Sequence, residues 1–382
     1  MCTVVGGTIA HDRYRTSQVK QKWIDAVSHL SQQPLSPMAL PRKVTVYLAP
    51  PPGDGGTSAA REHFREYVKP ILNAAAVDYD IVEARRMGEL RFLVAEAVRA
   101  QRRGDPDGPI EEVRKRVGIE RVGGAGGVVV VGRHAWKEYL AGMQEGWLGP
   151  LEAAAAAAAA APGPTAERPA DAAENTAGDS GGGDQGRGEE GVKKEEGEKV
   201  EGKEGEKVEE KKKGVPQPLL RADEFARANL PWDMPETLEP AGVIGFPFIL
   251  GFFNTPVRMY RFVTRRRMAD QVCREAAAAA LGRYRPFIAA AEPAGTMAGP
   301  QEVQDGLRAV EAGKTGQSGQ PGQPSEIDAL RDEEADWPGR VWKEERYRGG
   351  EWTERLAVDP RIQSRLRRFF IPSDLEPPEA GH

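Results

Sequence analysis

The sequence predicts an α/β fold: a small, mostly parallel sheet with flanking helices, followed by a helical C-terminal half and interrupted by long disordered insertions. Three observations predict it. Short β-branched runs alternate with amphipathic stretches between residues 43 and 148. A run of valines near residue 130 is continuously apolar, and two long segments are of low complexity.

Three segments are expected to form strands. Lys43–Ala49 (KVTVYLA) alternates and is rich in β-branched side chains, and Val77–Ala84 (VDYDIVEA) follows it. Gly127–Val131 (GVVVV) has no polar alternation, which is typical of a strand buried on both faces of a parallel sheet.

Apolar residues at helical spacing predict the intervening helices. Residues 16–33 carry one apolar stripe, and Ser58 can cap a helix whose apolar face runs from Phe64 to Leu72. Further helices are expected around residues 90–98, at Ile110–Val117 and at His134–Leu148. The resulting order, β-α-β-α-(α)-β-α, favours a parallel sheet with right-handed crossovers.

The remaining chain divides into segments of distinct composition. Residues 16–150 form the expected α/β domain, and residues 151–216, with an alanine run and a repeated EGEKVE, form a disordered insertion. Residues 217–290 are expected to be an apolar and basic helical segment packing on the domain, with a helix over Thr255–Arg285. Residues 291–330 are expected to be a disordered linker. Residues 331–382 form an aromatic-rich C-terminal segment with a short helix from Asp359 through Arg368.

The N-terminus admits two interpretations. Met1–Ala10 is apolar and precedes a polar, basic flank, so residues 1–15 resemble the last turns and juxtamembrane flank of a membrane anchor whose beginning is missing. An unremarkable frayed terminus has the same composition. A membrane span needs about 20 apolar residues, and the longest apolar run, Ala241–Phe253, is shorter and contains Pro247.

Bulk composition excludes several functions. The net charge of −5 is small, which argues against nucleic acid as a partner. The two cysteines and five histidines are scattered, so neither a disulfide framework nor a metal site is expected. Glycine and proline total 74, from 44 and 30, and are concentrated in the low-complexity stretches.

Two loops occupy positions where nucleotide sites occur. Pro50–Ser58 (PPPGDGGTS) joins a strand to a helix but lacks the lysine of a phosphate-binding loop. Gly132-Arg133-His134 follows the third strand, where open α/β sheets bind ligands. His134 is a candidate ligand there, or a capping residue. No catalytic or cofactor-binding residue is expected, because no serine or carboxylate lies at a recognisable spacing from His134.

Ala241–Phe253 (AGVIGFPFILGFF) leads into an arginine-rich helix, which resembles an interfacial anchor on anionic lipid. The alternative is a buried core segment followed by a solvated basic face. The candidate lipid contacts are Arg258, Arg261, Arg265, Arg266 and Arg267. The candidate interface residues are Ile244, Phe246, Phe248, Phe252, Phe253, Trp337, Trp342 and Trp352.

Several longer segments, in order, resemble the fifty-four-kilodalton subunit family of the fungal mitochondrial inner-membrane carrier translocase. They are KVTVYLAPPPGDG (Lys43–Gly55), REHFREYVKPIL (Arg61–Leu72), VVVVGRHAWKEYLAGMQEGWLGPL (Val128–Leu151), IGFPFILGFFNTPVRMYRF (Ile244–Phe262) and DPRIQSRLRRFF (Asp359–Phe370). The resemblance implies a single-pass inner-membrane protein with its bulk in the intermembrane space. It also implies partners: a channel-forming subunit, a second membrane subunit and small chaperones. It implies no catalytic residues and no cofactor.

We therefore expect a non-catalytic scaffold subunit that docks chaperones and the channel subunit and contacts inner-membrane lipid. Two other readings stay open. By fold analogy alone, the β-α-β-α-β start suggests a nucleotide-binding, lipid-kinase-like enzyme. The basic helix alternatively suggests a peripheral protein that binds anionic lipid.

Overall fold

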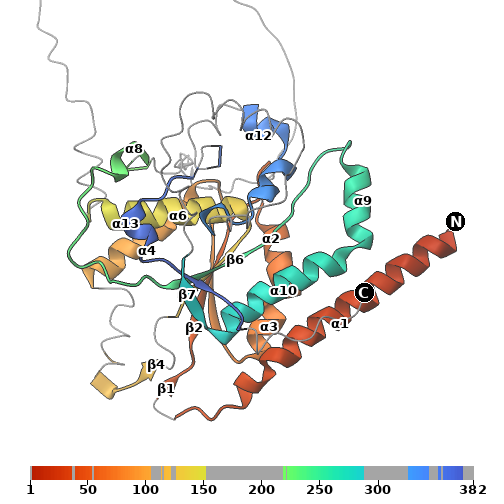
Figure 1. Ribbon diagram of the computed structural model, residues 1–382, viewed down its shortest axis with the longest axis horizontal. Helices are drawn as coiled ribbons and strands as arrows, with labels where there is room; N and C mark the ends of the chain where they lie inside the picture. The colour runs from red at the N-terminus through yellow and green to blue at the C-terminus, as the bar shows by residue number, and fades with distance from the viewer. Residues whose placement is uncertain are drawn as a thin grey trace, which may run out of the picture. The chain divides into compact units, whose positions relative to one another are not determined.

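The computed structural model describes residues 2–36, 39–53, 56–104, 113, 116–121, 126–151, 218–220, 222–287, 326–343, 352–353 and 356–372. Residues 1–153 and 215–382 belong to one compact unit, so the chain on both sides of the expected insertion at 151–216 builds a single body (Figure 1). That insertion beyond Leu151, most of the expected linker 291–330 and most of the predicted helix Ile110–Val117 lie outside the described residues.

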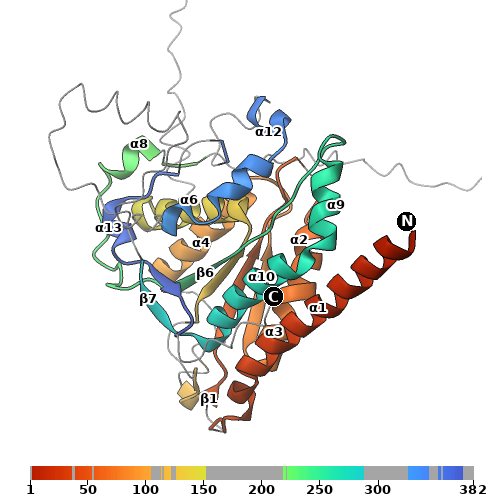
Figure 2. The same ribbon diagram turned by 45° about the vertical axis from the view of Figure 1, so that its right-hand side comes forward.

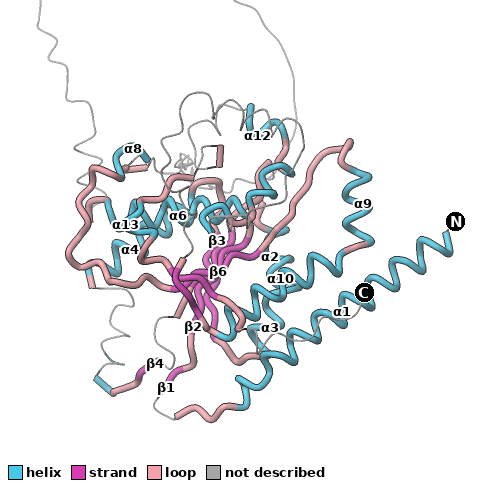
Figure 3. Tube along the Cα trace, in the orientation of Figure 1, coloured by secondary structure: helices cyan, strands magenta, loops and turns pink. Residues whose placement is uncertain are grey.

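A six-stranded sheet lies at the centre of this body (Figure 3). The strand order is β3-β2-β5-β6-β8-β7. The first five strands run parallel, and β7 pairs antiparallel with β8. The three predicted strands are confirmed as β2 (Lys43–Leu48), β3 (Asp78–Glu83) and β5 (Val128–Val131). A separate two-stranded pair joins β1 (Ala39–Leu40) to β4 (Glu120–Arg121).

The other three strands come from segments that we expected to be helical. β6 (Pro240–Ile244) pairs with β5, β7 (Tyr284–Pro286) follows a helix that ends at Leu281, and β8 (Arg367–Phe369) replaces the end of the helix predicted through Arg368. β6 is buried between two strands and so shows no polar alternation, while β7 and β8 are too short to show a period.

One face of the sheet is covered by the N-terminal helices and by α10 (Arg265–Leu281) (Figures 1 and 2). Val44, Val46, Val129 and Val131 point into this layer. The covering elements are α1 (Cys2–Ser28), a 3-10 turn at His29–Gln32, α2 (Ser58–His63), a π-helical turn at Phe64–Val68 and α3 (Lys69–Ala74). α1 is one continuous helix, so the segment expected to begin at residue 16 begins 14 residues earlier, at Cys2.

The opposite face is covered by α4 (Glu89–Arg103) and α6 (Arg133–Leu148). The alternate side chains of the same strands, such as Tyr47, Val130 and Val243, point into this second layer. Two short helices, α8 (Ala222–Phe225) and α13 (Pro360–Gln363), add Phe225 and Ile362 to it. Segments from both sides of the expected insertion thus complete the same core.

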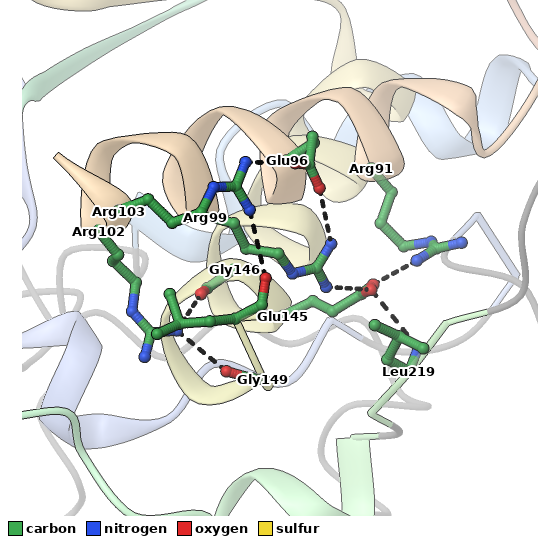
Figure 4. A network of polar contacts seen from close by, with 10 residues as sticks. Arg91, Glu96, Arg99, Arg102, Arg103, Glu145, Gly146, Gly149 and Leu219 are labelled. Atoms are coloured by element: carbon green, nitrogen blue, oxygen red, sulfur yellow. Dashed lines mark hydrogen bonds and ion pairs between the residues drawn. The ribbon is translucent and has the colours of Figure 1, made fainter. Parts of the chain in front are cut away.

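α4 and α6 are joined by a buried charge cluster (Figure 4). The Glu145 carboxylate accepts hydrogen bonds from Arg91 and, at 2.9 Å, from Arg99, and all three side chains are buried. The backbone N–H of Leu219 also donates to Glu145, at 3.4 Å. The cluster therefore fixes the chain that returns after the insertion onto the helical layer.

The last elements lie beyond the sheet. α9 (Thr255–Val263) projects from the body beside the N-terminal half of α1 (Figures 1 and 2). The C-terminal part contributes 3-10 helices at Glu326–Asp328 and Arg331–Asp336 and then α12 (Gly339–Lys343). Residues 326–330 are thus structured, although we expected them to belong to a disordered linker. Among the described helices, none combines the length and the apolar character that crossing a membrane requires.

Candidate functional site

The carboxyl ends of β2, β5 and β6 meet at one edge of the sheet, which is where open α/β sheets bind ligands. The segments that leave these strands are joined to one another by hydrogen bonds. The backbone N–H of Gly132 donates to the carbonyl of Ile244 at 2.8 Å, and the His63 side chain donates to the carbonyl of Gly245 at 2.9 Å. Burial lowers the pKa of His63 to about 4, so this imidazole is neutral near pH 7.

His134, the candidate ligand, is wholly buried at this edge. Its Nε2 donates to the carbonyl of Ala49 at 3.1 Å, and its ring contacts those of Phe246 and Trp352. Burial lowers the pKa of His134 to about 4. The neutral His134 side chain therefore packs between the chain that leaves β2 and the start of α6. Its Nε2 is not available to a ligand, because it already donates to the Ala49 carbonyl.

The N-terminus of α6 holds a carboxylate from a distant part of the chain. Glu333 accepts hydrogen bonds from the backbone N–H of Arg133 at 2.9 Å and of Phe246 at 2.5 Å. A helix N-terminus at the end of a parallel strand is the place where a phosphate binds in nucleotide-binding sheets. Burial raises the pKa of Glu333 to about 7, against the lowering effect of the two donors.

Two cations of α6 hold the same C-terminal chain. The Arg133 guanidinium, 2% exposed, binds Glu334 at 2.8 Å and the carbonyls of Ile327 and Ala329 at 2.7 and 3.0 Å. The Lys137 ammonium lies 3.0 Å from both Glu334 and the carbonyl of Trp352. The guanidinium that sequence analysis placed at a possible ligand site therefore binds the protein itself.

We call residues 326–343 the edge segment, because they lie across these strand ends. The segment reaches the loop after β2, where Arg340 donates to the carbonyl of Gly53. Asp54 and Gly55 of the candidate loop Pro50–Ser58 lie outside the described residues. At the other end, Asp336 binds Arg261 of α9 at 2.7 Å. The edge is thus occupied by the protein's own chain.

The eight candidate interface residues separate into two groups. Ile244, Phe246, Trp337 and Trp352 are buried, which corrects the expectation that they form an exposed interface. Ile244 ends a central strand, and the two tryptophans pack with Val341 between the edge segment and α6. The candidates that reach the surface are Phe248, which is half-buried, Trp342 at 40% exposure, Phe252 at 86% and Phe253 at 94%.

The five candidate lipid-contact arginines follow one another along α9 and the start of α10. Arg258 and Arg267 are exposed, and Arg261, Arg265 and Arg266 are partly buried. Arg261 forms a two-pronged ion pair with Asp336, at 2.7 and 3.2 Å. The Arg265 guanidinium stacks over the ring of Phe262 at 5.8 Å.

Two grooves lie where α1 meets α9 and α10. One, of about 540 Å³, is lined by Gly7, Thr8, His11, Asp12, Val263 and Arg266. A second, of about 350 Å³, is lined by Asp12, Arg13, Thr16, Ser17, Lys20, Glu66 and Arg265. The Asp12 carboxylate, 3% exposed, accepts a hydrogen bond from the backbone N–H of Arg265 at 3.1 Å, so it joins α1 to the start of α10.

Sequence reasoning missed two features of these surfaces. Glu333 carries no local signal, because its partners lie 200 and 87 residues away. Trp232, at 96% exposure, and two exposed side chains of α9, Val257 at 45% and Tyr260 at 58%, were not singled out. α9 contains no buried residue. The one sequence signal for such an exposed helix is that residues 240–269 contain no aspartate or glutamate. Within the described ranges, no His, Cys, Asp and Glu side chains gather into a metal-binding group.

Comparisons with known proteins agree over nearly the whole chain. Residues 1–369 match the family described as inner membrane protein import complex subunit Tim54. Three relatives are named mitochondrial import inner membrane translocase subunit Tim54. The Aspergillus fumigatus protein is 38% identical over 389 residues, covering 96% of this chain and 84% of its own. The Neurospora crassa protein is 40% identical over 389 residues, covering 96% and 74%. The Saccharomyces cerevisiae protein is 25% identical over 467 residues, covering 98% and 90%.

Proposed function

Since the chain belongs to the Tim54 family of inner-membrane protein import complex subunits, we propose that it is a non-catalytic subunit of the mitochondrial translocase that inserts multi-pass carrier proteins. Its folded part lies in the intermembrane space, and the protein is a single-pass protein of the inner membrane. Its role is to present docking surfaces to small chaperones, to the channel-forming subunit and to a second membrane subunit.

The observation that carries a docking role is the use of the sheet edge. The position at which a related fold would bind an anionic ligand holds Glu333, and the surrounding donors of Arg133 and Lys137 bind the edge segment. An edge used in this way fixes the edge segment to α6 and to the strand ends. This arrangement supports a rigid body whose outer surfaces make the contacts.

The exposed aromatic residues supply candidate anchors for protein partners. Trp232 is 96% exposed, and Trp342 stacks on Trp337 at 5.7 Å while remaining 40% exposed. Exposed tryptophans ringed by polar residues are typical hot spots of protein interfaces. We assign the chaperone and channel contacts to these residues, and treat the tip at Phe252 and Phe253 below.

Affinity purification tests the proposal. A tagged full-length chain, recovered from mitochondria in mild detergent, is expected to bring down the other translocase subunits and the small chaperones. Trp232→Ser and Trp342→Ser, combined, are expected to weaken this recovery, with the exposed Arg227→Ser as a matched surface control. Recovery of the wild-type chain without any translocase subunit would refute the assignment.

The nucleotide-binding alternative has its own test. An ATP phosphate at the N-terminus of α6 would have to displace the Glu333 carboxylate and the edge segment bonded to Arg133. We therefore expect calorimetry with ATP and Mg²⁺ to give no saturable heat. A tight, magnesium-dependent isotherm would favour the enzyme reading.

A further inference from the structure

α9 and the tip before it form an outer surface that the protein itself leaves uncovered. No residue of α9 is buried, and Phe252 and Phe253 at the tip are 86% and 94% exposed. Isolated helices shorter than about 12–15 residues are marginal in water, and α9 has 9 residues. A short helix with its apolar side chains in solvent is typical of a segment stabilised by a partner.

This surface carries only positive charge. Residues 240–269 contain five arginines and no aspartate or glutamate. Arg261 is neutralised by Asp336. Across the described residues, no carboxylate lies within ion-pair distance of the guanidinium of Arg258, Arg266 or Arg267. Large apolar side chains are therefore flanked by cations that the fold leaves uncompensated.

The N-terminal half of α1 lies beside this surface. The start of α10 is bonded to α1 through Asp12 and Arg265, and Arg266 lines the groove of about 540 Å³ together with Gly7 and Thr8. The sequence from Val4 to Ala10 carries no charge. α1 and α9 project from the same side of the body in both ribbon views (Figures 1 and 2). One flat surface can thus contact both elements.

We propose that this surface, formed by Phe252–Arg267 and the first turns of α1, binds the headgroup region of an anionic phospholipid membrane. Phe252 and Phe253 insert among the headgroups, and Arg258, Arg266 and Arg267 lie against phosphates. Amphipathic helices at membrane surfaces combine aromatic side chains on one face with cations on the other in this way. A protein partner is usually matched by charges of both signs at the rim of the interface, and this stretch offers no carboxylate.

The inference deepens the proposed function by naming a lipid contact, but its test needs no other subunit. In a Cys2→Ser background the sole remaining cysteine, Cys273, is buried. A polarity-sensitive dye can then be placed at Phe253→Cys. The matched control is Trp232→Cys, which is 96% exposed and precedes Met234 and Leu238 of the layer on the opposite face of the sheet.

With vesicles of phosphatidylcholine containing cardiolipin, the fluorescence emission of the dye at residue 253 is expected to shift to the blue. The emission of the dye at residue 232 is expected to stay unchanged. Pure phosphatidylcholine is expected to give a weaker shift, and high salt to reduce the shift seen with cardiolipin. Inorganic phosphate alone is expected to give none. A dye at residue 253 that stays solvated on cardiolipin vesicles overturns the proposal.

Flotation of unlabelled protein adds a quantitative arm. Arg258→Glu with Arg267→Glu, both at exposed positions, is expected to lower the partition coefficient at least about 30-fold. Phe252→Ser with Phe253→Ser is expected to lower it too, whereas Arg227→Glu is the inert control.

If the phenylalanine variant floats normally but fails to enter the translocase on native gels, the surface is a subunit contact and the lipid proposal fails. If the wild-type chain binds vesicles through residue 253 but recovers no translocase subunit, the lipid contact stands and the docking proposal fails.

Discussion

The carboxylate of Glu333 lies 2.9 Å from the backbone nitrogen of Arg133 and caps α6 from 200 residues further along the chain. Gly132, which precedes the helix, has no side chain with which to cap it. Capping by side-chain oxygens satisfies the free N–H groups at a helix start and is worth about 1 kcal/mol. The edge segment is therefore part of how α6, and with it the second layer, is stabilised.

Glu333 predicts a pH dependence of stability. Burial raises its pKa from an ordinary 4.5 to about 7, so between these values the folded chain holds a proton that the unfolded chain releases. The free energy of unfolding then falls as pH rises through this range. We expect the wild type to lose roughly 3 kcal/mol relative to Glu333→Gln between about pH 4.5 and about pH 7.5.

Urea unfolding at a series of pH values measures this difference. His63 and His134, whose pKa values are lowered to about 4, act in the opposite direction, but they are common to both proteins and cancel. Glu236→Gln, at an exposed position, is the control and is expected to run parallel to the wild type. Parallel curves for wild type and Glu333→Gln would contradict the buried carboxyl.

The cluster around Glu145 predicts a large effect on stability (Figure 4). Glu145→Gln leaves the buried guanidinium groups of Arg91 and Arg99 without their shared carboxylate. Breaking a buried pair by removing one partner destabilises a protein by about 3–5 kcal/mol. Thermal or urea unfolding checks this value. Glu96→Gln, on α4 with the two arginines but 41% exposed in its side chain, is expected to change the free energy of unfolding by less than about 1 kcal/mol.

Sequence patterns located the parts of the fold whose signals are local. Alternation in Lys43–Ala49 and the valine run at Val128–Val131 identified strands, because burial alternates along the start of β2 and is complete along β5. β6 and β8 were missed because their identity depends on neighbours far along the chain, with Val128 opposite Ala241 and Pro240 opposite Arg367. A three-residue strand contains no period to read.

The site was predictable only in part, for the same reason. The aromatic and basic character of Phe252–Arg267 is visible in the sequence, and the structure places Phe252 and Phe253 at the surface. Trp337 and Trp352 lie in segments that are just as aromatic and charged, but both side chains are buried. Their burial follows from long-range contacts: Lys137 of α6 binds Glu334 of the edge segment, and Glu138 of α6 accepts a hydrogen bond from the Trp352 side chain. Composition reports which side chains could make an interface. Long-range pairing decides which of them reach solvent.

We expect the stability of the fold to be sensitive to substitution at Gly132 as well. Its φ is +88°, and a Cβ there would lie 2.6 Å from the His134 ring. Gly132→Ala therefore combines a strained backbone with a clash, and we expect a loss of about 2–4 kcal/mol. Gly104 has a similar φ of +77° but open space around it, so Gly104→Ala isolates the backbone effect at about 1 kcal/mol. Equal losses for the two variants in urea unfolding would show that the strand ends are loosely packed.

The ion pair between Arg261 and Asp336 predicts a local effect without a global one. It joins α9 to the edge segment, and α9 itself buries no residue, so this pair and the contact with α1 are its main tethers. Asp336→Asn is expected to lower the free energy of unfolding by about 1 kcal/mol or less, because both partners are partly exposed. Hydrogen exchange of the α9 amides, read by mass spectrometry, is nevertheless expected to accelerate several-fold. Glu83→Gln removes another partly exposed pair, with Arg61, and should leave exchange in α9 unchanged. If α9 keeps its wild-type protection in Asp336→Asn, the packing of its end on α1 is enough to hold it, and the edge segment has no part in positioning the basic surface.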